Sequence, residues 1–313
     1  MARLIFSRLL QLPLILAVIF AVTLALTWLL PGNPLQRAEG PKLSPEVLRA
    51  VERQYALDSP WSFVGQYVRG VTVGSELYGW PDLGPSLSYR DQRVDELLAQ
   101  GLKTSLPLGF AGVGLALVLG TLAGLAGAWR PGSAVDGAAL TAALVGVSLP
   151  NFVTGGVLLM VFGGWLGWLP VSGLHTPVHG ILPAVTLSVI PAAYIARLTR
   201  LGLAEVMSSD FIRTARAKGL SREKTLLKHG LRVAFLPVLS FLGPATAAAM
   251  TGSFVVEQVF SLPGMGRFFV EAVLNKDQFL IMGTVLVYAT LLVLFNLAVD
   301  VLYAVVDPRI RAG

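Results

Sequence analysis

The chain has 313 residues, of which 54% are hydrophobic and 13% are charged, and its mean hydropathy is +0.70. A soluble domain carries about 25% charged residues, so this chain has too few to cover itself with polar surface in water, and lipid is the natural solvent for much of it. The composition excludes a disordered chain, and the absence of cysteine excludes a disulfide scaffold, a thiolate nucleophile and a zinc–thiolate site.

Six segments are apolar enough to be membrane helices, because a bilayer core about 30 Å thick requires roughly 20 apolar helical residues. They are Leu9–Leu30, Thr104–Trp129, Gly137–Gly163, Gly180–Ala196, Val233–Val256 and Leu280–Val305. Backbone amides in lipid must be paired internally, and alternating strand patterns are absent. The sequence therefore predicts an all-α integral membrane protein with six transmembrane helices.

The basic residues indicate which side of the membrane each loop occupies. One set of short segments holds 14 lysines and arginines, nine of them in the loop 197–232, while the opposite short loops hold only Arg267 and Lys276. By the positive-inside rule both termini are cytoplasmic. We predict an N-terminus and first helix over 1–30, a large extracytoplasmic loop over 31–103 and a five-helix core over 104–313. The net charge of +6 thus follows topology, and no nucleic-acid partner is expected.

The first helix precedes the large extracytoplasmic loop and is interpreted as an uncleaved anchor. Its apolar run is longer than the 7–15 residues typical of a signal peptide, and no small-residue cleavage site follows it. In the loop, Ser44-Pro45-Glu46 predicts the start of a short amphipathic helix. The loop is either a folded cap on the outer face or a docking surface or gate for something arriving from outside, and both interpretations stay open.

The basic loop 197–232 is expected to form two helices joined by a turn. Ser209 or Asp210 caps a first helix over Phe211–Lys218, Gly219 is suited to the left-handed residue that ends it, and Ser221 caps the second helix. Held between two spans, such an element can transmit force from a cytoplasmic partner. The alternative is a basic loop that only sets topology or contacts anionic lipid.

Motifs for catalysis, metal binding and nucleotide binding are missing from the sequence. No lysine follows a glycine, so a phosphate-binding P-loop is excluded. His175 and His179 are separated by Pro177, which favours a loop pair over two ligands on one helical face. The first five spans carry no internal charge, which disfavours a proton-coupled carrier, although sodium coupling through backbone carbonyls stays open. We expect no catalytic residue, no metal site and no cofactor on this chain.

Small residues in the fifth span permit close helix packing, or they form the wall of a pathway for a polar solute. The pathway candidates are Thr246, Met250, Thr251 and Ser253.

The basic loop also carries a recognisable motif. The run Phe211-Ile212-Arg213-Thr214-Ala215-Arg216-Ala217-Lys218-Gly219-Leu220-Ser221 closely resembles the cytoplasmic loop of dipeptide/oligopeptide ABC-transporter permeases. The residues Arg213, Thr214 and Ala215 stand where importer permeases have Glu-Ala-Ala, and Gly219 is the glycine of that motif. Further matches follow along nearly the whole chain, among them Pro31-Gly32-Asn33-Pro34, Asp82-Leu83-Gly84-Pro85-Ser86, Glu257-Gln258-Val259-Phe260 and Asp307-Pro308-Arg309. The long loop after the first helix is similar to that of the B-type subunit, with a longer stretch near Thr72–Pro81.

The resemblance implies a type I ABC importer permease in a bacterial or archaeal plasma membrane, forming half of a pathway for di- or oligopeptides. Its partners would be a homologous C-type permease, two cytoplasmic ATPases that bind ATP and Mg, and an extracytoplasmic substrate-binding protein. The segment 205–232 would couple to the ATPases through Asp210, Phe211, Arg213, Thr214, Ala215, Arg216 and Gly219. We assign Glu257, Pro263 and Gly264 to an outer loop or gate. Related nickel, glutathione or oligosaccharide importers remain alternatives, as do a stand-alone secondary carrier and a membrane enzyme or scaffold.

Overall fold

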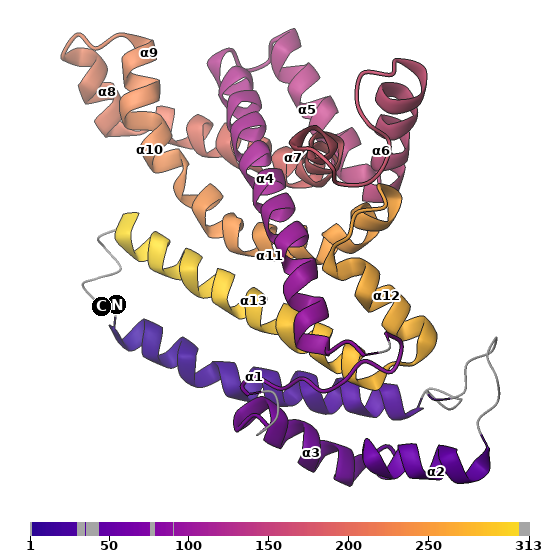
Figure 1. The fold of residues 1–313 in the computed structure, drawn as a ribbon. Helices are drawn as coiled ribbons and strands as arrows, with labels where there is room; N and C mark the ends of the chain where they lie inside the picture. The colour runs from indigo at the N-terminus through magenta and orange to yellow at the C-terminus, as the bar shows by residue number, and fades with distance from the viewer. Residues whose placement is uncertain (1, 30–34, 36–43, 76–78, 90, 307–313) are drawn as a thin grey trace. The chain divides into compact units, whose positions relative to one another are not determined.

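The computed structural model describes residues 2–29, 35, 44–75, 79–89 and 91–306 (Figure 1). The motifs at 31–34 and 307–311 lie outside these residues. Across the described ranges the structure is helical apart from two isolated bridges, Ser75 with Gly79 and Pro85 with Arg93. The chain forms two compact units: a core unit of Met1–Arg8, Leu106–Leu262 and Leu292–Gly313, and a loop unit of Leu9–Ser105 and Pro263–Leu291.

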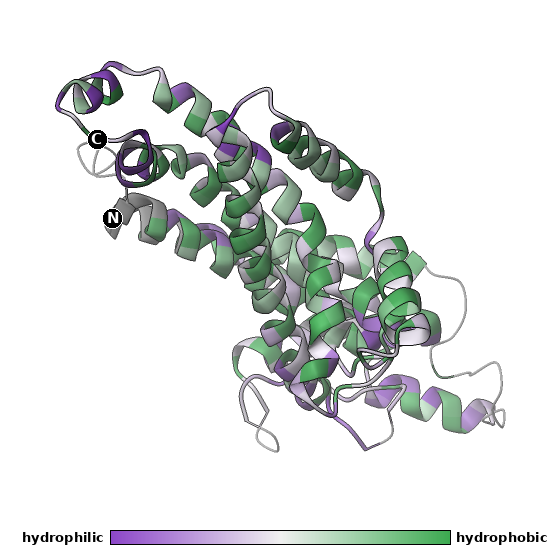
Figure 2. Ribbon diagram, turned by 90° about the horizontal axis from the view of Figure 1, so that it is seen from above, coloured by the Kyte–Doolittle hydropathy of each residue, from purple (hydrophilic) through white to green (hydrophobic). Residues whose placement is uncertain are grey.

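Four helices are long and apolar enough to cross a membrane by themselves. They are α1 (Ala2–Leu29), α4 (Val94–Trp129), α7 (Ile181–Met207) and α13 (Gln278–Val306). Two bent helix pairs raise the number to six if each pair is one span. Hydrophobic residues dominate the long helices, as the green colour of the ribbon in Figure 2 shows. The all-α membrane architecture predicted from composition is therefore confirmed.

The predicted third span is not one helix. It comprises α5 (Ala134–Ser148) and α6 (Asn151–Leu158), which continues as the π-helical η1 (Leu159–Trp165), and the two parts meet at an angle of 108°. The bend falls at Leu149, which has an extended backbone, and Pro150. A residue before proline is pushed out of the helical region, so this dipeptide ends α5.

The predicted fourth span ends too early. We expected it to stop at Ala196, but α7 continues to Met207 through Arg197 and Arg200. Leu203 on this extension is fully buried. A charged residue interrupts a hydropathy pattern without ending an amphipathic helix, and this is why the boundary was misplaced.

Small residues bring α4 against α7 in the core unit. A Cβ atom on Gly120 would lie 2.6 Å from the carbonyl oxygen of Ala192, and one on Gly124 would lie 2.6 Å from that of Ala196. Real Cβ atoms do not approach a carbonyl oxygen so closely, so these two positions require glycine. The two glycines are four residues apart and therefore on one helical face, the small-residue spacing that lets membrane helices pack backbone to backbone.

The large loop after α1 is folded. It contains α2 (Pro45–Gln54), whose first turn is capped by Ser44 as predicted, with the Val47 amide donating to the serine hydroxyl at 3.4 Å, and α3 (Pro60–Thr72). Phe63 of α3 is buried between aromatic rings, with centroid distances of 5.5 Å to Tyr67 and 5.0 Å to Phe279. These rings supply the loop unit with a core of its own.

Asp277, immediately before α13, joins two segments of the loop unit. Its buried carboxylate accepts hydrogen bonds from the Leu280 amide at 3.1 Å, the Ser86 hydroxyl at 2.6 Å and the Ser88 amide at 2.9 Å. The first of these bonds caps α13, and the other two anchor the chain before α4. Nearby Gly84 has a φ of +85°, and a Cβ there would collide with the Phe279 ring, so this position also requires glycine.

We predict that Asp277→Ala destabilises the protein by roughly 2–4 kcal/mol, because a helix cap and two further bonds to a buried carboxylate are lost together. Thermal unfolding of the detergent-purified chain measures this. Asp277→Asn is the matched control, since asparagine also caps helices and should cost clearly less. Equal melting temperatures for the alanine variant and the unchanged chain would contradict the assignment.

Candidate functional site

The segment between α7 and α11 (Leu236–Val259) forms a short helical hairpin. It consists of α8 (Asp210–Ala217), α9 (Arg222–Lys224), the π-helical η3 (Thr225–Gly230) and α10 (Leu231–Ala234). Figure 1 shows α8 and α9 side by side at one end of the core unit, beyond α10. We call residues 208–234 the inner hairpin.

The start of α8 is only partly as predicted. Ser209 occupies the cap position with an extended backbone, but its hydroxyl donates to the Val206 carbonyl at 2.6 Å and does not cap the helix. The helix begins at Asp210, one residue earlier than expected. The Asp210 carboxylate lies in the first turn, where the helix dipole favours negative charge.

The turn after α8 confirms the prediction for Gly219. Its φ is +84°, and no atom lies within 4 Å of a Cβ placed there. The requirement for glycine is therefore conformational and not steric crowding. The Leu220 amide donates to the Ala215 carbonyl at 3.3 Å across the turn, and the Ser221 hydroxyl caps the next helix by accepting from the Lys224 amide at 3.3 Å.

One side of the inner hairpin is fastened to the ends of the long helices. Ile212 and Leu226 are buried, and Leu226 belongs to a cluster with Ala128 of α4, Leu203 of α7 and Ala234 of α10. A Cβ on Gly202 would lie 2.8 Å from the Ala234 carbonyl oxygen, so the backbones of α7 and α10 touch. A displacement of the hairpin must therefore move the ends of α4 and α7, because close-packed side chains leave no slack.

The opposite side of the hairpin is exposed and charged. The side chains of Asp210 and Arg213 are 96% and 76% exposed, and their ion pair of 3.5 Å contributes little to stability at such a site. Phe211 is also exposed, which is unusual for a large apolar ring outside a membrane. Of the seven predicted coupling residues, six are exposed and Ala215 is half-buried. The structure therefore gathers these residues on one accessible element.

An ion pair that sequence reasoning missed lies close to the hairpin. Arg200 of α7 forms a two-pronged contact with Asp136 in the first turn of α5, including a 2.7 Å bond from Nη2 to Oδ2. Asp136 also accepts from the Gly132 amide at 2.9 Å. The pair ties the α4–α5 turn to α7. Arg200 was counted only among the basic residues of the loop 197–232, and nothing in the spacing of 64 residues pairs it with Asp136.

Three of the four predicted pathway residues on α11 are buried in the core unit. Thr246, Met250 and Ser253 are buried, and the two hydroxyls donate to the Leu242 and Met250 carbonyls of their own helix. The side chain of Thr251 lies outside the described part of the chain. The exposed positions of α11 include Pro244, Ala248, Val255 and Gln258. A pathway role for the four residues stays a prediction.

The predicted gate residues are divided between the units. Glu257 lies buried in the core unit near the end of α11, and its carbonyl accepts from the Leu262 amide at 2.8 Å. Pro263 and Gly264 belong to the loop unit, where Gly264 precedes α12 (Met265–Asn275). Their role as a gate likewise stays a prediction.

The two histidines lie in a loop and a turn, as expected from Pro177. His179 is part of the 3-10 turn Pro177–Gly180, and its ring lies 5.5 Å from that of His175. Among the described residues, no group of three or more histidine, cysteine or acidic side chains is placed to hold a metal ion.

Comparison with known proteins shows which family this chain resembles. Residues 68–312 match the family described as the binding-protein-dependent transport system inner membrane component, and residues 1–109 match its N-terminal family. The oligopeptide transport system permease protein OppB of Haemophilus influenzae is 40% identical, over 99% of this chain and 100% of that protein. The dipeptide transport system permease protein DppB of Bacillus subtilis is 37% identical, over 99% of this chain and 98% of that protein.

Solved structures agree in fold. An inward-facing structure of the MetNI methionine ABC transporter matches with a TM-score of 0.56 and 20% identity, covering 68% of this chain and 97% of that chain. A structure of an amino acid ABC transporter with histidines matches with a TM-score of 0.50 and 18% identity, covering 69% and 94%. The chain therefore belongs to the binding-protein-dependent transport system inner membrane components, and it is a multi-pass inner-membrane permease with the type I ABC importer fold.

Proposed function

We propose that this chain is one of two membrane subunits of an ABC importer for di- or oligopeptides. The observation that carries the proposal is its end-to-end similarity to relatives named as oligopeptide and dipeptide transport permeases. A homologous second permease would form the other half of the pathway, and an extracytoplasmic binding protein would deliver the peptide. Nickel, glutathione or oligosaccharide cargo is the alternative within the same class of transporter.

The inner hairpin faces the cytoplasm in this proposal, and both termini lie on the same side. Its exposed basic side chains support this orientation, because lysine and arginine in short loops are retained on the cytoplasmic side. They are Arg213, Arg216, Lys218, Arg222, Lys224, Lys228 and Arg232. The folded loop between α1 and α4 would then face outward, where a binding protein can dock.

The hairpin would receive the motion of a separate ATPase. Exposed Phe211 offers an apolar anchor and Arg213 offers a charge, the two kinds of group that dominate protein interfaces. The buried face around Leu226 would pass the movement to α4 and α7. ATP and Mg would bind to the ATPases, since this sequence lacks the Gly-Lys pair of a P-loop.

Reconstitution tests the proposed function. The purified chain should support peptide uptake into lipid vesicles only together with the second permease, the ATPases, the binding protein and ATP. A matched preparation containing an ATPase that cannot hydrolyse ATP should show none. Uptake against a gradient by this chain alone would identify a stand-alone carrier and refute the proposal.

We predict that Gly219→Val lowers ATP-driven uptake about tenfold or more while membrane insertion is unchanged, because a β-branched residue at positive φ costs about 1–3 kcal/mol of backbone strain. Gly219→Asn is the matched control, since asparagine tolerates this conformation and should retain most activity. Normal uptake by the valine variant would show that the shape of the turn is not required.

We also predict that Arg213→Glu weakens the association with the ATPase, because it reverses an exposed charge at the centre of α8. Co-purification of the ATPase with the tagged chain measures this, at low and high salt. Arg232→Glu makes the same charge change on α10 and should have a smaller effect. If the two variants retain equal amounts of ATPase, Arg213 does not belong to the interface.

A further inference from the structure

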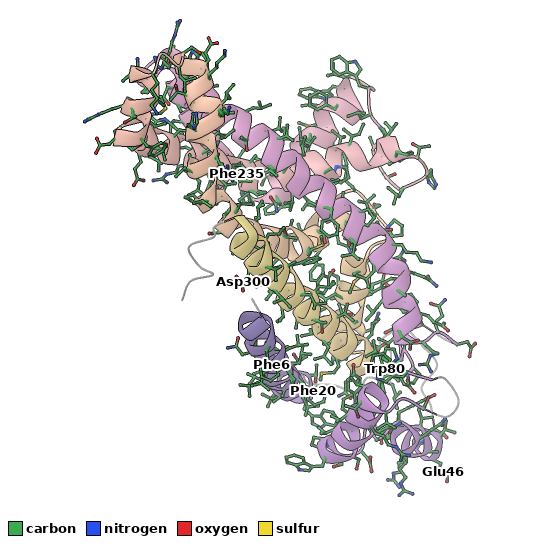
Figure 3. All side chains as sticks on the ribbon, turned by 90° about the vertical axis from the view of Figure 1, so that its left-hand side faces the viewer. Phe6, Phe20, Glu46, Trp80, Phe235 and Asp300 are labelled. Carbon is green, nitrogen blue, oxygen red and sulfur yellow. The ribbon has the colours of Figure 1, made fainter. Side chains whose placement is uncertain are left out.

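The loop unit contains an apolar groove of about 550 Å³ between α1, α3 and α13. Its volume is in the range of ligand pockets, which is roughly 300–1,000 Å³. The walls include Phe20 of α1, Val68 of α3 and Leu286 of α13, together with Leu83 from the segment between α3 and α4. Figure 3 labels Phe20 at this wall and Trp80 beyond the end of α3. All lining residues belong to the same compact unit.

The groove offers water almost nothing to bind. Thr72 and Thr290 line it, but their hydroxyls already donate to the Val68 and Leu286 carbonyls at 2.7 and 2.8 Å. Tyr67 lines it too, and its buried hydroxyl has no hydrogen-bond partner among the described residues. Burial, and after it the charge of Asp82 across a separate cavity that Tyr67 also borders, raises the pKa of the tyrosine. A cavity lined by carbon excludes water, and an apolar group can fill it.

The position of the groove between two membrane spans indicates which apolar molecule can reach it. Helices α1 and α13 are both membrane spans, and α1 exposes Leu14 and Val18 by 67% and 56%. Side chains exposed to this degree on a span face lipid hydrocarbon. The groove between the two spans is therefore continuous with the hydrophobic part of the bilayer.

Helix α3 places the groove at the edge of that hydrocarbon layer. It is too short to span a membrane, and exposed tryptophans flank its apolar surface, Trp61 near its start by 81% and Trp80 beyond its end by 70%. The Trp80 indole donates to the Val71 carbonyl at 2.8 Å. Amphipathic helices bordered by tryptophan are typical of the interface between headgroups and acyl chains.

We propose that this groove binds one acyl chain of a membrane phospholipid, which packs α3 onto α1 and α13. A flexible hydrocarbon chain is the abundant molecule at this depth whose chemistry matches the walls. The inference depends on membrane insertion and not on the transported solute. An apolar segment of a partner subunit is the competing occupant, and the experiment below separates it from lipid.

Photo-crosslinking tests the site. The full-length chain is placed in phosphatidylethanolamine–phosphatidylglycerol nanodiscs containing a small fraction of phospholipid with a diazirine near the end of one acyl chain, and labelled peptides are mapped by mass spectrometry. Labelling at Leu286 and Val68 should exceed labelling at Leu14 and Val18 several-fold. Uniform labelling of these positions would overturn the proposal, and this comparison uses the unsubstituted chain.

A groove-filling variant provides the second arm. Ala17 lines the groove on α1, whereas Ala25 is exposed on the same helix outside the groove. Ala17→Phe and Ala25→Phe therefore make the same chemical change inside and outside the groove. Only Ala17→Phe should reduce groove labelling several-fold. Undiminished labelling in a folded Ala17→Phe variant would refute the site. Loss of groove labelling from the unsubstituted chain in the assembled transporter would assign the groove to a partner subunit and also refute it.

Discussion

The packing of the inner hairpin against the ends of the long helices is the constraint on which the structural account rests. Leu226 is buried among Leu203, Ala128 and Ala234, and the backbones of α7 and α10 touch at Gly202. An exposed loop joined to the spans only by flexible linkers would absorb a push from a partner. The buried contacts of this hairpin with α4 and α7 are the route by which, in the proposed function, a displacement reaches the long helices. The Arg200–Asp136 pair extends the same connection from α7 to the α4–α5 turn.

The charges of the chain have separate roles along its length. Exposed basic residues gather on the hairpin, buried carboxylates such as Asp277 hold the loop unit together, and the pathway candidates on α11 are neutral. Glu257 and Asp300, the acidic residues of α11 and α13, lie toward the ends of their helices, so the middle of these two spans offers no proton relay. Energy supplied from outside the chain is consistent with this distribution, and we propose that the hairpin receives it.

Local chemistry explains which features could be predicted from the sequence. Gly219, Ser221 and Ser44 were assigned correctly because positive φ and helix capping depend on a few neighbouring residues. The bend at Pro150 and the continuation of α7 past Arg197 were missed because average hydropathy does not register direction or amphipathic spacing. The Arg200–Asp136 pair was missed because tertiary packing brings together residues distant in sequence. The burial of Thr246 and Ser253 likewise depends on which face of α11 packs against α7 and α6.

The most direct test is a distance measurement between the hairpin and the long helices. The sequence has no cysteine, so spin labels can be placed at Lys224→Cys on α9 and Leu122→Cys on α4, two exposed positions in the core unit, without first removing a native cysteine. The distance distribution is recorded in the assembled transporter before and after ATP binding. Rigid transmission predicts the same mean and width in both states. A shifted or broadened distribution would show that the hairpin flexes against the spans, and it would contradict the account.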